Sequence, residues 1–438
     1  GRPPTSADEI QICRTWAEVL DLDPDAVHLD DNFFRIGGHS LLATRVVSRL
    51  NQALGVNLPV TSIFQNPTVS ALAALIRDSR EDSAPHFEGI RAVAPDEAVP
   101  ATHTQQRLWY LDQLDPMDPL YNVPICLELN GSIESERMQQ ALEQVVNCHD
   151  SLRTTFSVHS VEPVLDVDDE LRVSLRVEDI TDAEEADVKR FIDRLMTEGF
   201  DLARGPLFRA ALIRREQDKF LFVLVVHHIV FDGWSANIFL KDLLRVYSGL
   251  TDRADFELEQ AMPQFRDYAK WQHNWVRSGG ARAQLDVWRT RLSGQLPTLN
   301  VPTQSPRPTV RSTKGAQVSL AIAPDQMEKI RSSCDEAQVT PYIYFLTAYA
   351  ALLFRYTQQT DVVIGTTIAN RRTTETEGIV GCFVNTLPLR LQFTPEVTFH
   401  ELLGQVRTVC LEAFADQDIP FATQAEGLQP LGDAGRAT

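Results

Sequence analysis

One stretch of the chain, from Arg77 to Pro100, divides it into two parts with different hydrophobic periods. The stretch mixes charged residues, Ser and Pro without a steady period, which is typical of an interdomain linker. Before it, apolar residues recur only at helical spacing, whereas after it helical and strand patterns alternate. A chain of 438 residues can form two or three compact units. We therefore expect an all-α unit over residues 6–78, a linker over 79–98 and an α/β unit over 99–438.

The first part is predicted to be a small helix bundle. Ala7–Leu20 and Leu41–Ala53 have helical periodicity, and a short helical turn is expected near Ser62–Phe64. Thr68 is in the N-cap position of a last helix. The pattern indicates three long helices and one short one.

The second part is predicted to be a mixed α/β structure in two lobes, residues 99–262 and 263–438, with a cleft between them. Its clearest strand is the apolar run Leu221–Val226, which is typical of a strand buried on both faces. Further strands are expected at 122–129, 152–158, 172–177, 207–214, 316–322 and 361–367. Helices are expected at 104–114, 133–148, 183–198, 235–247, 265–275, 284–292 and after Thr340.

Composition excludes several classes of function. A formal net charge of −19 argues against nucleic-acid binding, which needs clustered Lys and Arg. The six cysteines are scattered, so neither a metal site nor a disulfide framework is expected, and reduced thiols fit a cytoplasmic protein. The longest apolar stretch, Pro341–Phe354, is shorter than the roughly 18 residues of a membrane span. It is predicted to be a buried helix.

Ser40 lies where a Gly37-Gly38 turn meets a helix, and helix N-termini favour phosphate. Taken alone, such a serine fits an ordinary N-cap. The whole stretch from Asp31 to Leu41 (DNFFRIGGHSL) closely resembles the attachment motif of peptidyl carrier domains, and the flanking helices match that family in length and order. The resemblance implies that a phosphopantetheinyl transferase attaches phosphopantetheine to Ser40, whose thiol then carries a thioester.

The apolar run ends in His227-His228, followed by Asp232-Gly233. Neighbouring strand residues point to opposite faces, so only one of the two histidines can face a given cavity. Taken alone, a buried histidine pair fits core packing. The pattern HHxxxDG, however, resembles condensation domains, which are relatives of chloramphenicol acetyltransferase. Five further stretches resemble the same family in the same order: QQRLW from 105, HDSLRTTF from 149, FRDYAKWQ from 265, GCFVNT from 381 and DQDIPF from 416.

The resemblance implies a two-lobed fold with a catalytic motif made of His227, His228, Asp232 and Gly233. It places His228 in the catalytic channel, where a neutral imidazole orients the attacking amine or accepts its proton. Asp232 is expected to pair with an arginine, with Arg153 as the candidate, rather than to touch substrate. The Gly233 N–H is expected to polarise the donor carbonyl.

Some positions depart from the family pattern, namely Cys148, Asp150 and Asp416, and are expected to be structural. The family normally continues well past Pro420-Phe421, so the second lobe is expected to be incomplete. Relatives that epimerise as well as condense carry a second adjacent histidine pair near the start of the domain, whereas His227-His228 is the only adjacent pair here, so the resemblance implies an L or achiral donor.

The resemblance implies as partners a downstream acceptor carrier, adenylation domains of the same synthetase and the phosphopantetheinyl transferase. Two alternatives remain: an epimerase, which shares HHxxxDG but is disfavoured by the QQRLW start, and a docking platform without catalysis. An intact His228 and Gly233 weigh against the platform.

Overall fold

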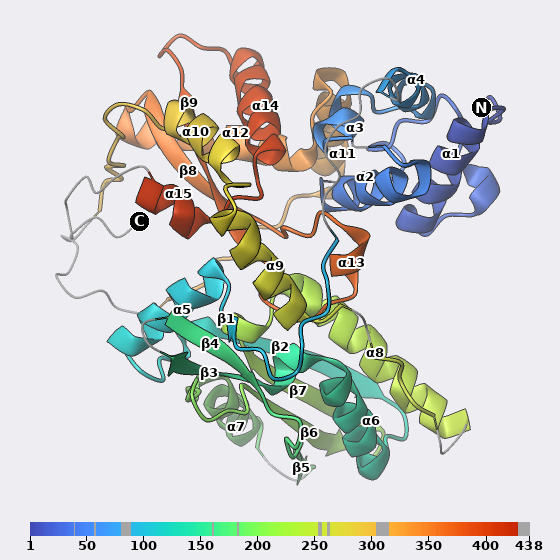
Figure 1. Cartoon of the computed structure of the whole chain (residues 1–438), viewed down its shortest axis with the longest axis vertical. Coiled ribbons are helices and arrows are strands. Elements are labelled where there is room, and N and C mark those ends of the chain that lie inside the picture. Colours follow the sequence, from blue (N-terminus) through green and yellow to red (C-terminus); the bar gives the residue numbers. More distant parts are fainter. Residues whose placement is uncertain are drawn as a thin grey trace.

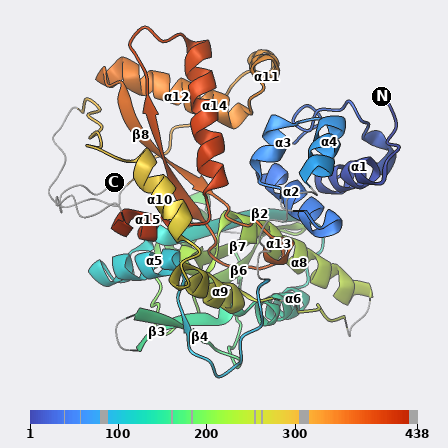
Figure 2. The same cartoon turned by 45° about the horizontal axis from the view of Figure 1, so that its top comes forward.

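The computed structural model describes residues 1–38, 40–56, 58–79, 89–159, 162–181, 184–252, 256–260, 263–303 and 315–427. It places a helical unit at the N-terminus beside a larger α/β part that has two lobes (Figure 1). The helical unit lies against the second lobe, and Figure 2 shows the same arrangement from another side.

The helical unit contains α1 (Ala7–Leu20), α2 (Ser40–Leu54), α3 (Thr61–Gln65) and α4 (Val69–Ser79), as the sequence predicts. The first helix begins with a capping box, in which the Ser6 hydroxyl accepts from the Glu9 N–H and the Glu9 carboxylate accepts from the Ser6 N–H. The Thr68 hydroxyl accepts from the N–H of Ala71 at the start of α4. These caps define where the helices begin, while the buried apolar faces hold the bundle together.

The first lobe is built on two sheets. One has the order β2-β7-β6-β5, with β5 and β6 parallel and the other pairs antiparallel. The other is antiparallel with the order β1-β4-β3. The strands are β1 (Val99–Pro100), β2 (Asn122–Asn130), β3 (Thr154–His159), β4 (Glu162–Val167), β5 (Leu175–Asp179), β6 (Phe208–Glu216) and β7 (Lys219–His227). The helices are α5 (His103–Leu114), α6 (Ser135–Cys148), α7 (Glu185–Thr197) and α8 (Gly233–Asp252), with 3₁₀ turns η3 (Asp150–Arg153) and η4 (His228–Val230).

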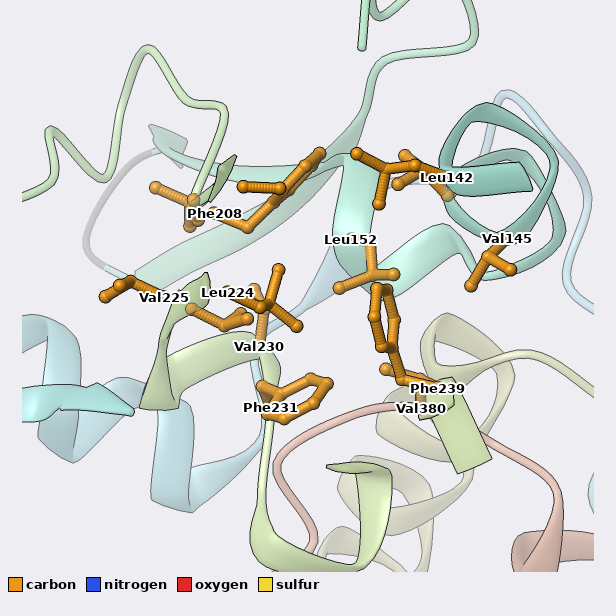
Figure 3. Packing of buried hydrophobic residues seen from close by; sticks show 14 of the residues in the cluster. Leu142, Val145, Leu152, Phe208, Leu224, Val225, Val230, Phe231, Phe239 and Val380 are labelled. Atoms are coloured by element: carbon orange, nitrogen blue, oxygen red, sulfur yellow. The ribbon is translucent and has the colours of Figure 1, made fainter. Parts of the chain in front are cut away.

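Strand β7 is the centre of this lobe, because it pairs with β2 on one side and β6 on the other. Its residues from Leu221 to His227 are all buried, which is the reason for the unbroken apolar run. Figure 3 shows how Leu224 and Val225 pack near Val230 and Phe231, just beyond the strand. The core also takes residues from later in the chain, including Phe265 and 379–380. The end of β7 is therefore held from both parts of the α/β unit.

The second lobe contains a two-stranded antiparallel sheet, β8 (Asp361–Ile368) and β9 (Asn385–Gln392). The chain after the first lobe also forms α9 (Phe265–Arg277), α10 (Arg282–Arg291), α11 (Pro324–Ala337), α12 (Pro341–Thr357), α13 (Thr374–Glu377), α14 (Phe399–Ala415) and α15 (Phe421–Gly427). Of these, α9 contacts β1 and η3 of the first lobe, and α13 contacts α2 of the helical unit. The strand predicted at 316–322 is wrong. Its side chains Val318 and Leu320 are exposed, and no described strand pairs with the segment. Alternating apolar residues form a strand only where a neighbouring strand supplies hydrogen-bond partners.

Helix α12 is buried on one face only. Ile343, Leu346, Ala350 and Leu353 face the core, whereas Tyr349 and Tyr356 are exposed, so the prediction of a buried helix is half right. Among the described residues, no single helix is long and apolar enough to cross a membrane; α11 and α12 reach that length and composition only as a pair bent by 100°.

Candidate functional site

The turn before Ser40 depends on its two glycines. Gly37 has a φ of +110°, a conformation that side-chain-bearing residues avoid. At Gly38, an added Cβ would come within 2.4 Å of the Phe33 ring, and the Gly38 N–H donates to the Phe33 carbonyl over 2.8 Å. This tight turn places Ser40 as the first residue of α2, where the leading N–H groups have no acceptor within the helix.

His228 lies at the end of β7, in η4, and keeps partial solvent exposure. Its Nδ1 is 2.7 Å from the carbonyl oxygen of Phe231. Because a carbonyl oxygen only accepts, Nδ1 carries the hydrogen and Nε2 keeps its lone pair in the neutral ring. The Cys382 sulfur lies 3.9 Å from Nδ1, and burial raises the pKa of that thiol, so it stays neutral. The backbone therefore sets the tautomer that leaves Nε2 as a hydrogen-bond acceptor.

His227 has a different environment, as predicted, because it is the last residue of β7 whereas His228 begins the turn η4. It is buried between the rings of Tyr121 and Phe200, and its Nδ1 accepts from the N–H of Ile229 over 3.1 Å. Burial, with a smaller effect from His228, lowers the pKa of His227 to about 4. The structure thus places His227 in the core, and it brings only His228 to the surface.

The lowered pKa of His227 makes stability depend on pH. Between about pH 6.5 and pH 4, the unfolded chain binds a proton at this residue and the folded chain does not, so folding weakens as pH falls. The unmodified chain should therefore lose about 2 kcal/mol of unfolding free energy at this residue between pH 7 and pH 5. His227→Gln lacks the titrating group, so its unfolding free energy should rise by about that amount relative to the unmodified chain over the same pH range. Urea unfolding at both pH values measures this, with the exposed His400→Gln as the control. A pH-independent difference between His227→Gln and the unmodified chain would contradict it.

Asp232 is buried and binds an arginine, but the candidate partner Arg153 was wrong. The carboxylate oxygens of Asp232 lie 3.2 and 3.3 Å from Nη2 of Arg371, and both side chains are 1% exposed. The same carboxylate accepts from the Ser235 N–H and hydroxyl and from the Phe383 N–H. Asp232 therefore fixes the start of α8 and the 381–383 segment around His228.

Arg153 lies elsewhere because its own 3₁₀ turn leads into β3. Its Nη1 contacts the Asp169 carboxylate over 2.6 Å and the Asp168 carbonyl over 3.1 Å. The sequence contained a weak signal for the true partner, since Arg371-Arg372 follows β8 after two intervening residues. Nothing local, however, relates residue 371 to residue 232, because their contact is made only by tertiary packing.

Removing Arg371 is expected to destabilise the fold strongly. Arg371→Leu leaves the Asp232 carboxylate buried without its counter-charge, and it also removes donors to the carbonyls of Thr376 and Ile379. Breaking a buried pair in this way costs about 3–5 kcal/mol. Urea unfolding at pH 7 measures this loss in the free energy of unfolding. The matched control is Arg14→Leu, which breaks an exposed pair with Glu18 and should leave stability unchanged. Equal effects of the two substitutions would refute the structural role.

Gly233 is the first residue of α8, and an added Cβ there would meet open space. Its backbone thus faces a region that other groups can approach. The predicted site residues separate into three places: Ser40 on the helical unit, His228 with Asp232 and Gly233 just beyond the end of β7, and Arg153 in η3, where it binds Asp169 instead of Asp232.

A cavity of about 300 Å³ lies between the helical unit and the α/β part. From the helical unit it is lined by Thr44, one turn after Ser40, and by Phe64. From the α/β part it is lined by Trp234, which follows Gly233, and by Arg371, the partner of Asp232. The cavity therefore has the attachment helix on one side and residues next to the His228 loop on the other.

Comparison with known proteins supports both parts. Residues 11–76 match the family model of the phosphopantetheine attachment site, and residues 96–436 match that of the condensation domain. Gramicidin S synthase 2 of Aneurinibacillus migulanus is 34% identical over 99% of the chain, which spans 9% of that protein. Malpinin synthetase of Mortierella alpina is 34% identical over 98% of the chain, which spans 6% of it.

Solved structures show the same fold. The X-domain from teicoplanin biosynthesis superposes with a TM-score of 0.72 at 27% identity, covering 80% of this chain and 77% of that one. The condensation domain from the Monacolin K polyketide synthase MokA superposes with a TM-score of 0.68 at 25% identity, covering 77% of each chain. The chain therefore belongs to the condensation-domain family, and it carries ahead of that domain a phosphopantetheine-attachment carrier domain, the arrangement found in nonribosomal peptide synthetases.

Proposed function

We propose that this chain forms an amide bond between a donor acyl group on its own carrier domain and an acceptor amine on a downstream carrier. The observation that carries the proposal is the fixed tautomer of His228. The Phe231 carbonyl holds the hydrogen on Nδ1, so the neutral ring presents an acceptor at Nε2. The partial exposure of this ring is compatible with substrate access.

The residues around Ser40 fit a phosphopantetheine group. Ser40 begins α2 after a turn that only glycine fits, and the cavity lined by Thr44 lies beside the same helix. Bound through Ser40, the group supplies a thiol that carries the donor as a thioester. The Ser40 hydroxyl provides the attachment point, and the open helix N-terminus favours the phosphate.

The reaction is aminolysis of that thioester. With phosphopantetheine on Ser40, the amine nitrogen would attack the donor carbonyl carbon and form a C–N bond, while the C–S bond would break and the proton lost by the amine would end on the released thiol. An α-amino group has a pKa near ~8, so part of it is already unprotonated at neutral pH. His228 Nε2 orients the amine and accepts its hydrogen bond, and the Gly233 N–H polarises the donor carbonyl. Holding both substrates in place lowers the barrier by up to ~7–11 kcal/mol, more than proton transfer contributes.

The donor is proposed to be L or achiral, since His227-His228 is the only adjacent histidine pair. The acceptor arrives on a downstream carrier, adenylation domains of the same synthetase supply both substrates, and a phosphopantetheinyl transferase modifies Ser40. The reaction is proposed to take place in the cytoplasm.

Intact-protein mass spectrometry after mixing the donor-loaded chain with a loaded acceptor carrier tests this function. Growth of the acceptor's load by the donor residue is the expected result. Unchanged loads with deuterium uptake at the donor α-carbon would indicate epimerisation instead, and unchanged loads without exchange would indicate a docking platform. Repeating the assay across several acceptor amino acids defines the acceptor range.

A further inference from the structure

The carrier domain contacts the condensation domain through an acidic residue on α13. Helix α2 lies against α13 in both views of the fold (Figures 1 and 2). Oε2 of Glu377 accepts from Nε of Arg45 over 3.3 Å and from Nη2 of Arg49 over 3.2 Å. Nearby, the Thr374 hydroxyl donates to the Gln52 side-chain oxygen over 2.9 Å. Two arginines of one carrier helix thus converge on one carboxylate.

Burial makes this contact selective. The Glu377 side chain is only 13% exposed, and its second oxygen, Oε1, is buried without a hydrogen-bond partner in the part of the chain that the structure describes. A carboxylate in such a place is costly unless a positive charge faces it. A docked carrier without these arginines would leave Glu377 buried and unpaired, and one with acidic residues would add repulsion.

Each side of the contact is also held by interactions within its own domain. The Glu377 carbonyl accepts from Trp234 Nε1 over 3.0 Å, and Arg371 donates to the carbonyl of Thr376 beside it. On the carrier, Arg49 is steadied by Glu18, 3.5 Å away. Such preorganisation reduces the entropy lost on docking, so charge complementarity can decide which carrier docks.

The apolar contacts between the carrier domain and the condensation domain lack this selectivity. Phe64 of α3 packs near Phe414 of α14 at 6.4 Å between ring centroids, and Leu411 joins the carrier core. Apolar contact contributes affinity in proportion to area, whichever carrier provides it. Discrimination between carriers therefore depends on the charges.

We propose that Glu377 is the residue by which this condensation domain selects its donor carrier. It accepts carriers with arginine five and nine residues after the modified serine, positions that share one helix face. The inference rests on the proposed function and adds a specificity residue to it.

A charge exchange in the full chain tests the inference. The rate of single-turnover amide formation, from a donor on Ser40 to an acceptor carrier, is measured for Glu377→Arg, for Arg45→Glu with Arg49→Glu, and for all three together. Each reversal alone is expected to lower the rate at least about tenfold, and the combination to restore it to within about threefold. The matched control, Asp335→Arg, breaks an exposed contact with carrier residue Arg35 and should change the rate less than about twofold.

A diffusible donor thioester, which bypasses carrier docking, separates selection from folding. Glu377→Arg should use this donor at the rate of the unmodified chain. An equal loss with the diffusible donor, an unchanged rate with the tethered donor, or no recovery in the combined variant would each overturn the role of Glu377. Absence of amide formation by the unmodified chain would instead refute the proposed function, so the two failures are distinguishable.

Discussion

A Ser40→Ala chain is expected to keep its unmodified mass when it is incubated with coenzyme A and a phosphopantetheinyl transferase. Ser40 is the first residue of α2 and lies within the stretch that matches the phosphopantetheine attachment site. Without its hydroxyl no phosphodiester can form, so no donor is held in place. Amide formation from a carrier-bound donor should therefore fall to background, the largest effect expected for any single substitution here.

The fold should survive this change, because alanine is a good helix former and exchanging a serine at a helix start costs about 1 kcal/mol. Intact-protein mass spectrometry reads the modification directly. Ser70→Ala, on α4 of the same carrier domain, is the matched control and should gain one phosphopantetheine group. A mass gain by Ser40→Ala, or none by the unmodified chain, would contradict the assignment.

Features encoded over a few neighbouring residues could be predicted from the sequence. The carrier helices follow from apolar spacing and from caps such as Ser6 and Thr68, and their bounds agree with prediction to within about two residues. Strand β7 follows from its unbroken apolar run. Strand alternation also predicts different environments for His227 and His228, and they do differ, although β7 ends at His227 and His228 already belongs to the turn η4.

Features that depend on distant partners could not be predicted. The segment at 316–322 has the alternation of a strand, but strand formation also requires a neighbour, which local sequence does not specify. Likewise, the sequence indicates that Asp232 needs an arginine, while the identity of Arg371 depends on how β8 and α13 pack beside α8. Glu377 was not predicted either, since its role exists only in the contact between two domains.

His228→Ala is expected to slow amide formation from a fully loaded chain by about 10²–10⁴-fold, the usual contribution of a positioned acid–base group. The substitution removes the Nε2 acceptor that the Phe231 carbonyl keeps available. Some activity should persist, because the free amine is itself a nucleophile and the loss leaves the holding of both substrates intact. Single-turnover kinetics with equal donor loading, checked by mass, measures the step itself.

His227→Gln is the matched control, because it separates a loss of catalysis from a loss of stability. His227 is buried between Tyr121 and Phe200, and its Nδ1 accepts a hydrogen bond from the Ile229 N–H. Its replacement should therefore lower the free energy of unfolding, while the rate of amide formation by the molecules that remain folded should fall far less than in His228→Ala. If the two substitutions slowed a folded, loaded chain equally, the motif would be acting as a structural unit and the assignment of His228 would fail. If His228→Ala kept the full rate, positioning alone would carry the reaction, because proton transfer would then contribute nothing measurable to the barrier.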